Sequence, residues 1–303
     1  MRPLTIKYLA IMTALILALP TLGVAKGRPE PFLRASVGDE KVVEGERLIY
    51  EVTLFTPNPQ VVGIEEVISP DFGVLPNTRS AADTSLDKVE IDGDTYYKAV
   101  VDRYFIGLNE KGKKAIKGGT YKLGFNQPER VDDPFWGPMV QNRTEVISLK
   151  APDVSVKVSP LPVKGRPEDF SGAIGEYEIS AFIPEGAVLS DKDALMIVTV
   201  SGFGDLTKSD LPEIRKAFPE GLQFKSMTDN RDFYVKDGRL GSEIEIECTF
   251  QPRSAGSFEI SPIEFHYFNT KTGKYETAVS EPLEVEVETG LEEKDKRTVI
   301  TDV

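Results

Sequence analysis

Apolar and polar side chains alternate over short runs in this chain, and Gly, Pro, Asn and Asp separate the runs. Alternation with a period of two residues is typical of half-buried β-strands, and the separating residues favour turns. Helical periodicity is scarce. The pattern therefore predicts an all-β fold of Ig-like β-sandwiches. The main runs are LIYEVTLF (48–55), TYYKAVVDRYFI (95–106), TYKLGF (120–125), VSVKVSPLP (154–162), YEISAFI (177–183), LMIVTVSGF (195–203), EIEIECTF (243–250) and PLEVEVE (282–288).

The same order of elements occurs twice. The first half contains VEGERLIYEVTL, ISPDFGVLP, YYKAVVDRYFIGL, GGTYKLGF and ISLKAPDVSVKV, and the second contains LSDKDALMIVTV, FPEGLQF, GSEIEIECTFQP, AGSFEISPIEFHYF and SEPLEVEVE. We predict two tandem Ig-like β-sandwich domains, residues 30–162 and 163–288, followed by a polar tail at 289–303. PLPVKGRPEDFSG is the expected linker. DLPEIRKAFPEG is predicted to form a short helix capped by Asp210, with Pro212 in its first turn.

The N-terminus has the order of an export signal. Arg2 and Lys7 precede the apolar run Leu9–Leu19, and small residues follow up to Ala25. This order predicts a signal peptide, residues 1–25, that is cleaved after Ala25. The apolar run is shorter than the ~20 residues that span a bilayer, so an uncleaved anchor is the less favoured alternative. We expect no direct membrane span in this chain.

Charge and cysteine content exclude two classes of protein. The chain has 36 basic and 49 acidic residues and a formal net charge of −13, which repels nucleic acid. Cys248 is the only cysteine, so no intrachain disulfide can form and a packed core must supply the stability. Alternation places Cys248 in line with Ile244 and Ile246, which predicts a buried, inert thiol.

Few side chains could carry catalysis. His266 is the only histidine and lies in FEISPIEFHYFNTKTGKYET (258–277), which predicts a strand and a hairpin turn at NTKTGK. We expect His266 on the less buried face of that strand, beside Glu264 and Phe268. One histidine and one cysteine do not provide the usual zinc ligands, and no G-x-S-x-G motif is present. We therefore predict no enzyme activity, no cofactor and no metal site.

The candidate contact residues are acidic and aromatic. Asp132, Asp133, Phe135 and Trp136 lie in PERVDDPFWGP, predicted as a long loop. Such a loop can bind a partner, or its aromatics can fold back on the sandwich. The alternative function is a carbohydrate-binding or carbohydrate-cleaving envelope protein, in which Trp136 stacks on a sugar and Asp132 and Asp133 supply the two carboxylates of a glycosidase. Asp205, in SGFGDL, is a further candidate contact residue.

Motifs of the second half resemble the BatD, or oxygen-tolerance, family. VSVKVSPLPVKGRPEDFSGAIGEYEISA matches V-x-V-x-P-L-P followed by P-x-x-F-x-G-x-V/I-G-x-Y/F. VTVSGFGDL resembles T-x-x-G-x-G-N-L with Asp205 in place of Asn, and IEFHYFNTKTGKYET resembles I-x-F-x-Y-F-D-x-x-T-G-x-Y-x-T. The resemblance covers residues 150–288, whereas the first half matches mainly in its order of elements. The matching positions of the first motif are Pro160, Leu161, Pro162, Pro167, Phe170, Gly172, Gly175 and Tyr177.

The resemblance implies an exported, β-rich protein of the bacterial periplasm or cell envelope that is associated with aerotolerance or stress. The family usually occurs beside von Willebrand factor A-domain proteins, tetratricopeptide-repeat (TPR) proteins and a MoxR-type ATPase, so envelope proteins of the first two kinds are the expected partners. No catalytic residues are assigned in the family. We therefore predict a non-enzymatic protein-protein binding or assembly module. Asp132, Asp133 or Asp205 is hypothesised to complete the metal site of a von Willebrand A-type partner.

Overall fold

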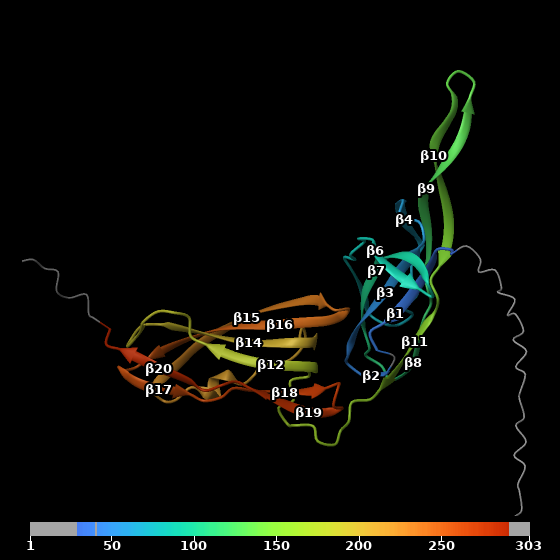
Figure 1. Cartoon of the computed structure of the whole chain (residues 1–303). Coiled ribbons are helices and arrows are strands. Elements are labelled where there is room, and N and C mark those ends of the chain that lie inside the picture. The colour runs from blue at the N-terminus through green and yellow to red at the C-terminus, as the bar shows by residue number, and fades with distance from the viewer. Residues whose placement is uncertain (1–28, 40, 291–303) are drawn as a thin grey trace, which may run out of the picture.

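The chain is built almost entirely of β-strands. A computed structural model describes residues 29–39 and 41–290 (Figure 1). The predicted signal peptide and most of the predicted polar tail lie outside these residues. The described strands form two β-sandwiches in tandem, which confirms the predicted fold class.

None of the helical residues described makes a segment long and apolar enough to cross a membrane.

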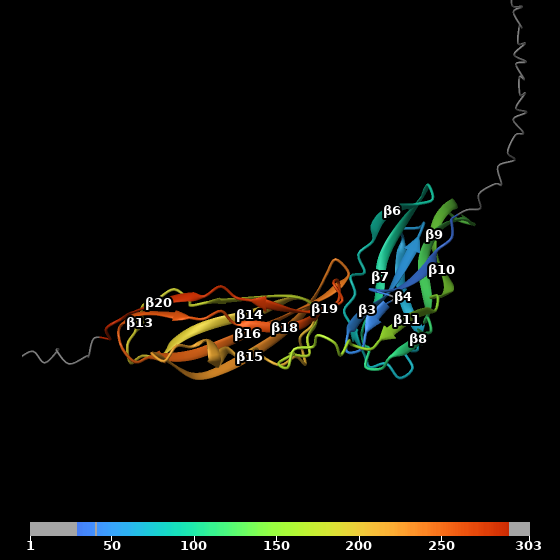
Figure 2. The ribbon, with the colours of Figure 1, turned by 90° about the horizontal axis from the view of Figure 1, so that it is seen from below.

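The first sandwich contains β1 to β11 and the second contains β12 to β20 (Figures 1 and 2). The strands of the first are β1 Phe32–Val37, β2 Lys41–Val43, β3 Arg47–Thr56, β4 Val61–Ile68, β5 Asn77–Ser80, β6 Asp87–Ile91, β7 Asp94–Gly107, β8 Gly112–Ile116, β9 Thr120–Asp133, β10 Gly137–Lys150 and β11 Val154–Ser159. The strands of the second are β12 Ile174–Phe182, β13 Val188–Leu189, β14 Ala194–Asp205, β15 Leu222–Lys236, β16 Arg239–Pro252, β17 Gly256–Ile260, β18 Glu264–Asn269, β19 Lys274–Val279 and β20 Leu283–Glu288.

Each sandwich has one large sheet and smaller facing sheets. In the first, the sheet β1-β3-β7-β5, with β6 also on β7, faces the sheets β10-β9-β4 and β2-β11-β8. In the second, the sheet β15-β16-β14-β12-β18-β19 faces β13-β20-β17. Each sandwich encloses its own apolar core, as expected for layered β domains.

The strand pairings of the first sandwich recur in the second. The antiparallel pairs β1–β3, β3–β7, β8–β11 and β9–β10 correspond to β12–β14, β14–β16, β17–β20 and β18–β19. The parallel pair β2–β11 corresponds to β13–β20. The two halves of the chain therefore share these pairings, in agreement with the repeated order of elements in the sequence. They differ in that the hairpin pairs with β4 in the first half and with β12 in the second.

A buried polar network crosses the first core. The side chain of Asp102, in β7, accepts hydrogen bonds from Arg79 Nε at 2.9 Å and from Tyr121 Oη at 3.0 Å, and Arg79 Nη2 also lies 2.8 Å from Glu66 Oε2. Burial raises the pKa of the Asp102 carboxyl, and the hydrogen bond from Tyr121 and the charge of Arg79 oppose that shift. Because these residues come from β4, β5, β7 and β9, the network ties the two layers together.

The second core is apolar at its centre. Ile244, Ile246 and Cys248 point inward from β16, as the alternation predicts, and all three are fully buried. Burial raises the pKa of the Cys248 thiol to about 11, so the thiol stays protonated and inert at neutral pH. Glycine is required where β12 meets β14, because a Cβ at Gly204 would lie 2.1 Å from Tyr177 Oη.

One predicted element differs in the structure. The segment before β15 contains only a four-residue 3-10 helix, η1 Ile214–Ala217. The residue preceding it is Glu213, which makes no side-chain cap, so the predicted cap by Asp210 is wrong. The backbone of Asp210 instead donates to Ser171 O at 2.7 Å, which holds this part of the chain against the linker.

The two sandwiches meet where β3 approaches β16 (Figures 1 and 2). The guanidinium group of Arg47 lies over the ring of Phe105 and is 3.4 Å from Asp205 Oδ2. Phe105 also makes an edge-to-face contact with Phe233 of the second sandwich, with 5.2 Å between ring centroids. One ring contact, Phe105 with Phe233, and one ion pair, Arg47 with Asp205, thus connect the sandwiches at this point.

Candidate functional site

The β9–β10 hairpin is the element that leaves the body of the molecule (Figure 1). β4 pairs with β9 only from Thr120 to Phe125. Beyond Phe125, residues 126–144 continue as a two-stranded ribbon, here called the arm. The predicted long loop around PERVDDPFWGP is therefore wrong, because these residues form the end of the hairpin. Cross-strand pairing of Val131 with Met139 extends the ladder close to the turn.

The tip of the arm gathers four of the predicted contact residues. Asp132 and Asp133 end β9, where they pair with Pro138 and Gly137 of β10. The turn between the strands presents Phe135 and Trp136, which are 91% and 83% exposed. Their aromatic rings therefore do not fold back into the sandwich core, which was the structural alternative for this segment.

Exposure of both aromatics gives the tip a large potential for binding. A Phe or Trp side chain buries roughly 150–250 Å² when it is covered. At about 25 cal/mol per Å², covering both rings would contribute several kcal/mol. An exposed carboxylate, Asp132, lies next to them, so the tip combines apolar area with a charge.

Asp205 lies apart from the tip. It ends β14 at the contact between the sandwiches, and its side chain is 19% exposed. The carboxylate accepts hydrogen bonds from Thr207 N at 2.9 Å and from Thr207 Oγ1 at 2.6 Å, and it forms the ion pair with Arg47. These contacts give Asp205 a structural position, so the structure does not bring all five predicted residues together.

Glu46 is a titratable residue that is not one of the predicted contact residues. It lies in the turn between β2 and β3 and lines hollows bounded by both sandwiches, with Arg239 and Ile174 on the other side. Burial raises the pKa of the Glu46 carboxyl to about 7; a hydrogen bond from Val43 N–H opposes the shift and the charge of Asp39 adds to it. No local pattern reveals this residue, because part of its surroundings comes from the second sandwich.

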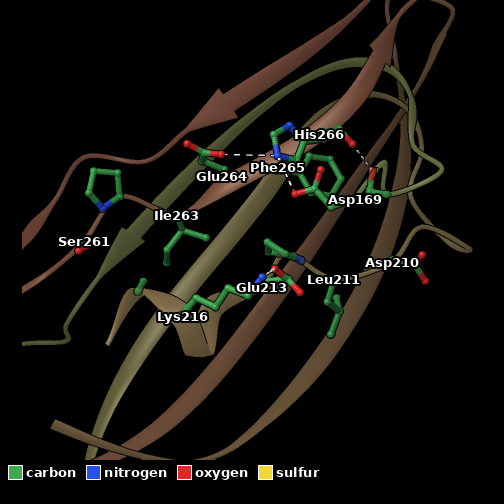
Figure 3. A pocket seen from close by; sticks show the side chains of 14 residues that line it. Asp169, Asp210, Leu211, Glu213, Lys216, Ser261, Ile263, Glu264, Phe265 and His266 are labelled. Carbon is green, nitrogen blue, oxygen red and sulfur yellow. Dashed lines mark hydrogen bonds and ion pairs between the residues drawn. The ribbon is translucent and has the colours of Figure 1, made fainter. Parts of the chain in front are cut away.

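His266 borders a cavity of about 280 Å³ in the second sandwich (Figure 3). Its Nδ1 lies 2.8 Å from Thr277 Oγ1, and its Nε2 lies 3.1 Å from Asp169 Oδ2 and 3.5 Å from Glu264 Oε2. His266 is half-buried on the predicted face. Phe268 on that face is buried, contrary to the expectation, because its ring packs against Tyr275.

The lining of the cavity contains both charged and apolar side chains. Asp210 and Glu213 face it together with Lys216, which is paired with Glu213 (Figure 3). Leu211 and Phe265 belong to its apolar lining. Across the described part of the chain, no group of three or more His, Cys, Asp or Glu side chains is arranged to hold a metal ion. Both nitrogens of the imidazole already have protein partners.

The linker between the sandwiches is fastened to the second one. Tyr275 Oη donates to Pro162 O at 2.7 Å and accepts a hydrogen bond from Arg166 Nε at 2.9 Å. The rings of Phe170 and Tyr275 make an edge-to-face contact at 5.1 Å. Phe170 and Tyr275, which belong to two different motifs of the family resemblance, therefore contact each other.

Comparison with known proteins finds a family similarity for one part of the chain. Residues 188–287 match the family model described as the BatD DUF11 like domain. No curated protein matches. Among solved structures, the C-terminal domain of the AgI/II polypeptide BspA from Streptococcus agalactiae is 7% identical and covers 84% of this chain and 99% of that chain, with a TM-score of 0.20. A structure named BspA_C_WT is 8% identical and covers 85% and 100%, with a TM-score of 0.21. TM-scores this low carry no information about function.

The matched range begins with the first residue of β13 and ends within β20. It contains the VTVSGFGDL and IEFHYFNTKTGKYET motifs, whereas the motif from Pro160 to Tyr177 precedes it. At the level of the family, this match connects the chain with envelope proteins associated with aerotolerance. Residues 188–287 of this chain are therefore similar to the BatD DUF11 like domain, and this match confirms the resemblance seen in the sequence.

Proposed function

We propose that this protein is a non-enzymatic binding and assembly module, exported to the bacterial envelope, that holds a protein partner through the tip of the arm. The observation that carries this proposal is the exposure of Phe135 and Trp136, 91% and 83%, at the end of a ribbon that leaves the sandwich. Aromatic side chains of this kind are enriched at the centres of protein interfaces.

The arm does not serve the core of its own sandwich. Among the described strands, none pairs with the arm beyond Phe125, and an isolated two-stranded ribbon is only marginally stable in water. A partner that covers the tip would supply the missing contacts. The binding energy would come mainly from the two rings, and the polar residues around them would set the orientation.

Asp132 is the carboxylate that this proposal assigns to a metal-containing partner. The family resemblance suggests von Willebrand A-type and TPR proteins as partners, and a carboxylate from this chain could complete a magnesium site in the first kind. Asp132 is exposed beside the aromatic tip. Asp205 is already held by Arg47 and Thr207, so Asp132 is the better candidate.

The proposal can be tested by crosslinking in living cells with a tagged copy, followed by mass spectrometry of the envelope fraction. We expect the wild type to recover one or a few envelope proteins. Phe135→Ser combined with Trp136→Ser should reduce that recovery by roughly tenfold or more. Phe182→Ser is the matched control, because Phe182 is an exposed aromatic of the second sandwich, 48% exposed and away from the arm.

The outcomes separate the possible ligands. Equal recovery of proteins by wild type and tip variant would contradict the proposal. Capture of glycan without protein, lost in Trp136→Ala, would instead favour the carbohydrate-binding function. Loss of the protein partner in EDTA, and in Asp132→Asn, would support magnesium coordination by this carboxylate, whereas binding unchanged in EDTA would exclude that part of the proposal.

A further inference from the structure

The side of the arm presents a second feature, the open edge of β10. β10 pairs with β9 along its whole length, from Gly137 to Lys150, and no strand among the described residues pairs with its other edge. The ladder with β9 shows no register shift. An edge strand that is long and regular presents a row of unpaired backbone N–H and C=O groups, which can accept a further strand.

The other edge strands of the described sheets are short or irregular. β4 has register shifts at Val61/Gly63 and at Glu66/Ile68, and β15 has one at Phe224/Ser226. β19 has only six residues, and the remaining edges are no longer than that. Short edges and bulges are common ways to prevent strand addition. Among the edge strands of residues 29–39 and 41–290, β10 is therefore the long one that lacks bulges.

Within the arm, the two edges differ. β9 carries Pro128 in the arm, and proline cannot donate a backbone hydrogen bond to an added strand. β10 contains Pro138 near its start, but none from Met139 to Lys150. An incoming strand is thus directed to the β10 edge.

We infer that two copies of this chain associate by antiparallel pairing of their β10 edges about a two-fold axis at Thr144. β10 carries three charged residues, Arg143, Glu145 and Lys150. In a symmetric antiparallel pair, paired residues lie on the same face, and an axis at Thr144 places Arg143 of each copy opposite Glu145 of the other. No other symmetric register of β10 pairs opposite charges.

Neighbouring registers are unfavourable. An axis at Arg143 or at Glu145 would place each of these residues opposite its own copy, and like charges directly opposite each other destabilise a sheet. With the axis at Thr144, Met139 faces Leu149 of the second copy, which adds an apolar pair. Arg143 is 3.7 Å from Glu129 in its own chain, yet its side chain is 74% exposed, so its charge can reach the second copy.

The pairing would give each arm additional strands on its open side. Joining two ribbons by their β10 edges makes a four-stranded sheet in the arms, and sheets of three or more strands are more stable than an isolated hairpin. The contact uses the side of the arm and not Phe135 or Trp136, so it goes beyond the function proposed above and does not depend on it.

Cysteine crosslinking of the purified full chain tests the register. Residues opposite each other in an antiparallel pair have Cα atoms about 4.5–5.5 Å apart, which suits a disulfide. Thr144→Cys should therefore form a covalent dimer under mild oxidation. Thr228→Cys, an exposed threonine on the bulged edge strand β15, is the matched control and should remain monomeric. Cys248 is fully buried and does not compete.

Charge reversal provides the second test. By light scattering coupled to size exclusion, the wild type should be a dimer. Arg143→Glu and Glu145→Arg should each weaken dimerisation by roughly tenfold or more, because each creates two like-charged pairs. The double variant R143E/E145R exchanges the charges and should restore the dimer.

A monomeric wild type, or a double variant no better than the single ones, would overturn the inference. So would crosslinking of Thr228→Cys as efficient as that of Thr144→Cys. Circular dichroism of the single variants excludes loss of folding as the cause of a monomer. A monomer in solution would leave the function of the tip unaffected, because the crosslinking test in cells measures a different contact.

Discussion

The hairpins β9–β10 and β18–β19 occupy corresponding places in the strand order of the two halves but differ in length and in the sheet to which they belong. β18 and β19 have six residues each, whereas β9 and β10 have fourteen each. Both hairpins are preceded by corresponding elements and followed by the strand that closes the smaller sheet, β11 or β20. Six residues per strand are thus sufficient for this hairpin in the second sandwich, and the additional length in the first produces the arm.

The short hairpin is closed by local polar contacts. Asn269 Oδ1 accepts hydrogen bonds from Lys271 N at 2.9 Å and Thr272 N at 3.2 Å, and Asn269 Nδ2 donates to Glu276 at 2.7 Å. Gly273 has a φ of 67°, which the turn requires. The long hairpin ends instead in exposed Phe135 and Trp136. The comparison indicates that the tip of β9–β10 is suited to contact and the tip of β18–β19 to closure of the fold.

Amide hydrogen exchange should show the largest difference between the hairpins. Amides of residues 126–133 should exchange roughly a thousandfold faster than those of β18, because opening the unsupported ribbon costs ~1 kcal/mol and opening the sandwich several kcal/mol more. The measurement should use Arg143→Glu, in which the inferred pairing of β10 edges is broken. Similar protection in both hairpins would show that the arm is not an independent ribbon.

Replacing one glycine by alanine should cost more stability in the strand pair beside β18 than in the strand pair that contains β9. β18 pairs with β12, which packs tightly on β14 at Gly204, whereas β9 pairs with β4 at Gly63. A Cβ at Gly204 would lie 2.3 Å from Ile174 O, but a Cβ at Gly63 would meet nothing within 4 Å. We expect Gly204→Ala to cost about 4 kcal/mol in urea unfolding and Gly63→Ala less than about 1 kcal/mol. Equal costs would contradict this account of β12 and β14.

The acidic residues in the corresponding turns before β3 and β14 should differ in their effect on the pH dependence of stability, and this effect is the smallest of the three. The Glu46 carboxyl has a folded-state pKa raised from 4.5 to about 7, so the folded state retains its proton while the unfolded state ionises. Stability should therefore fall as the pH rises from about 4.5 to about 7, by no more than about 3 kcal/mol. Glu46→Gln should remove this loss.

The measurement is urea unfolding at pH 5 and pH 8 of the wild type and Glu46→Gln. We expect the variant to gain stability relative to the wild type at pH 8 and to match it more closely at pH 5. Asp193→Asn is the matched control, because Asp193 is an exposed acid in the corresponding turn of the second sandwich. If the free energies of unfolding of the wild type and Glu46→Gln differed by the same amount at both pH values, the raised pKa of Glu46 would be contradicted.

Much of the fold could be predicted from the sequence, because strand formation and the choice of face depend on residues close together in the chain. The alternation around Cys248 correctly placed it with Ile244 and Ile246 in the core. The hairpin turn after Asn269 was also predicted correctly from NTKTGK. The predicted helix capped by Asp210 was wrong, because Asp210 is held by a backbone contact to Ser171 that no local pattern reveals.

The sequence by itself therefore determined the β class, the tandem repeat and the acidic and aromatic composition of the candidate contact segment. Tertiary structure decided which of those residues meet: Asp132, Phe135 and Trp136 are at the tip, and Asp205 is at the contact between sandwiches. It also decided the burial of Glu46 and the open edge of β10. The physical reason is that strand length and alternation are local properties of the chain. The point at which β4 stops pairing with β9, and the contact of the second sandwich with Glu46, depend on segments far apart in the sequence.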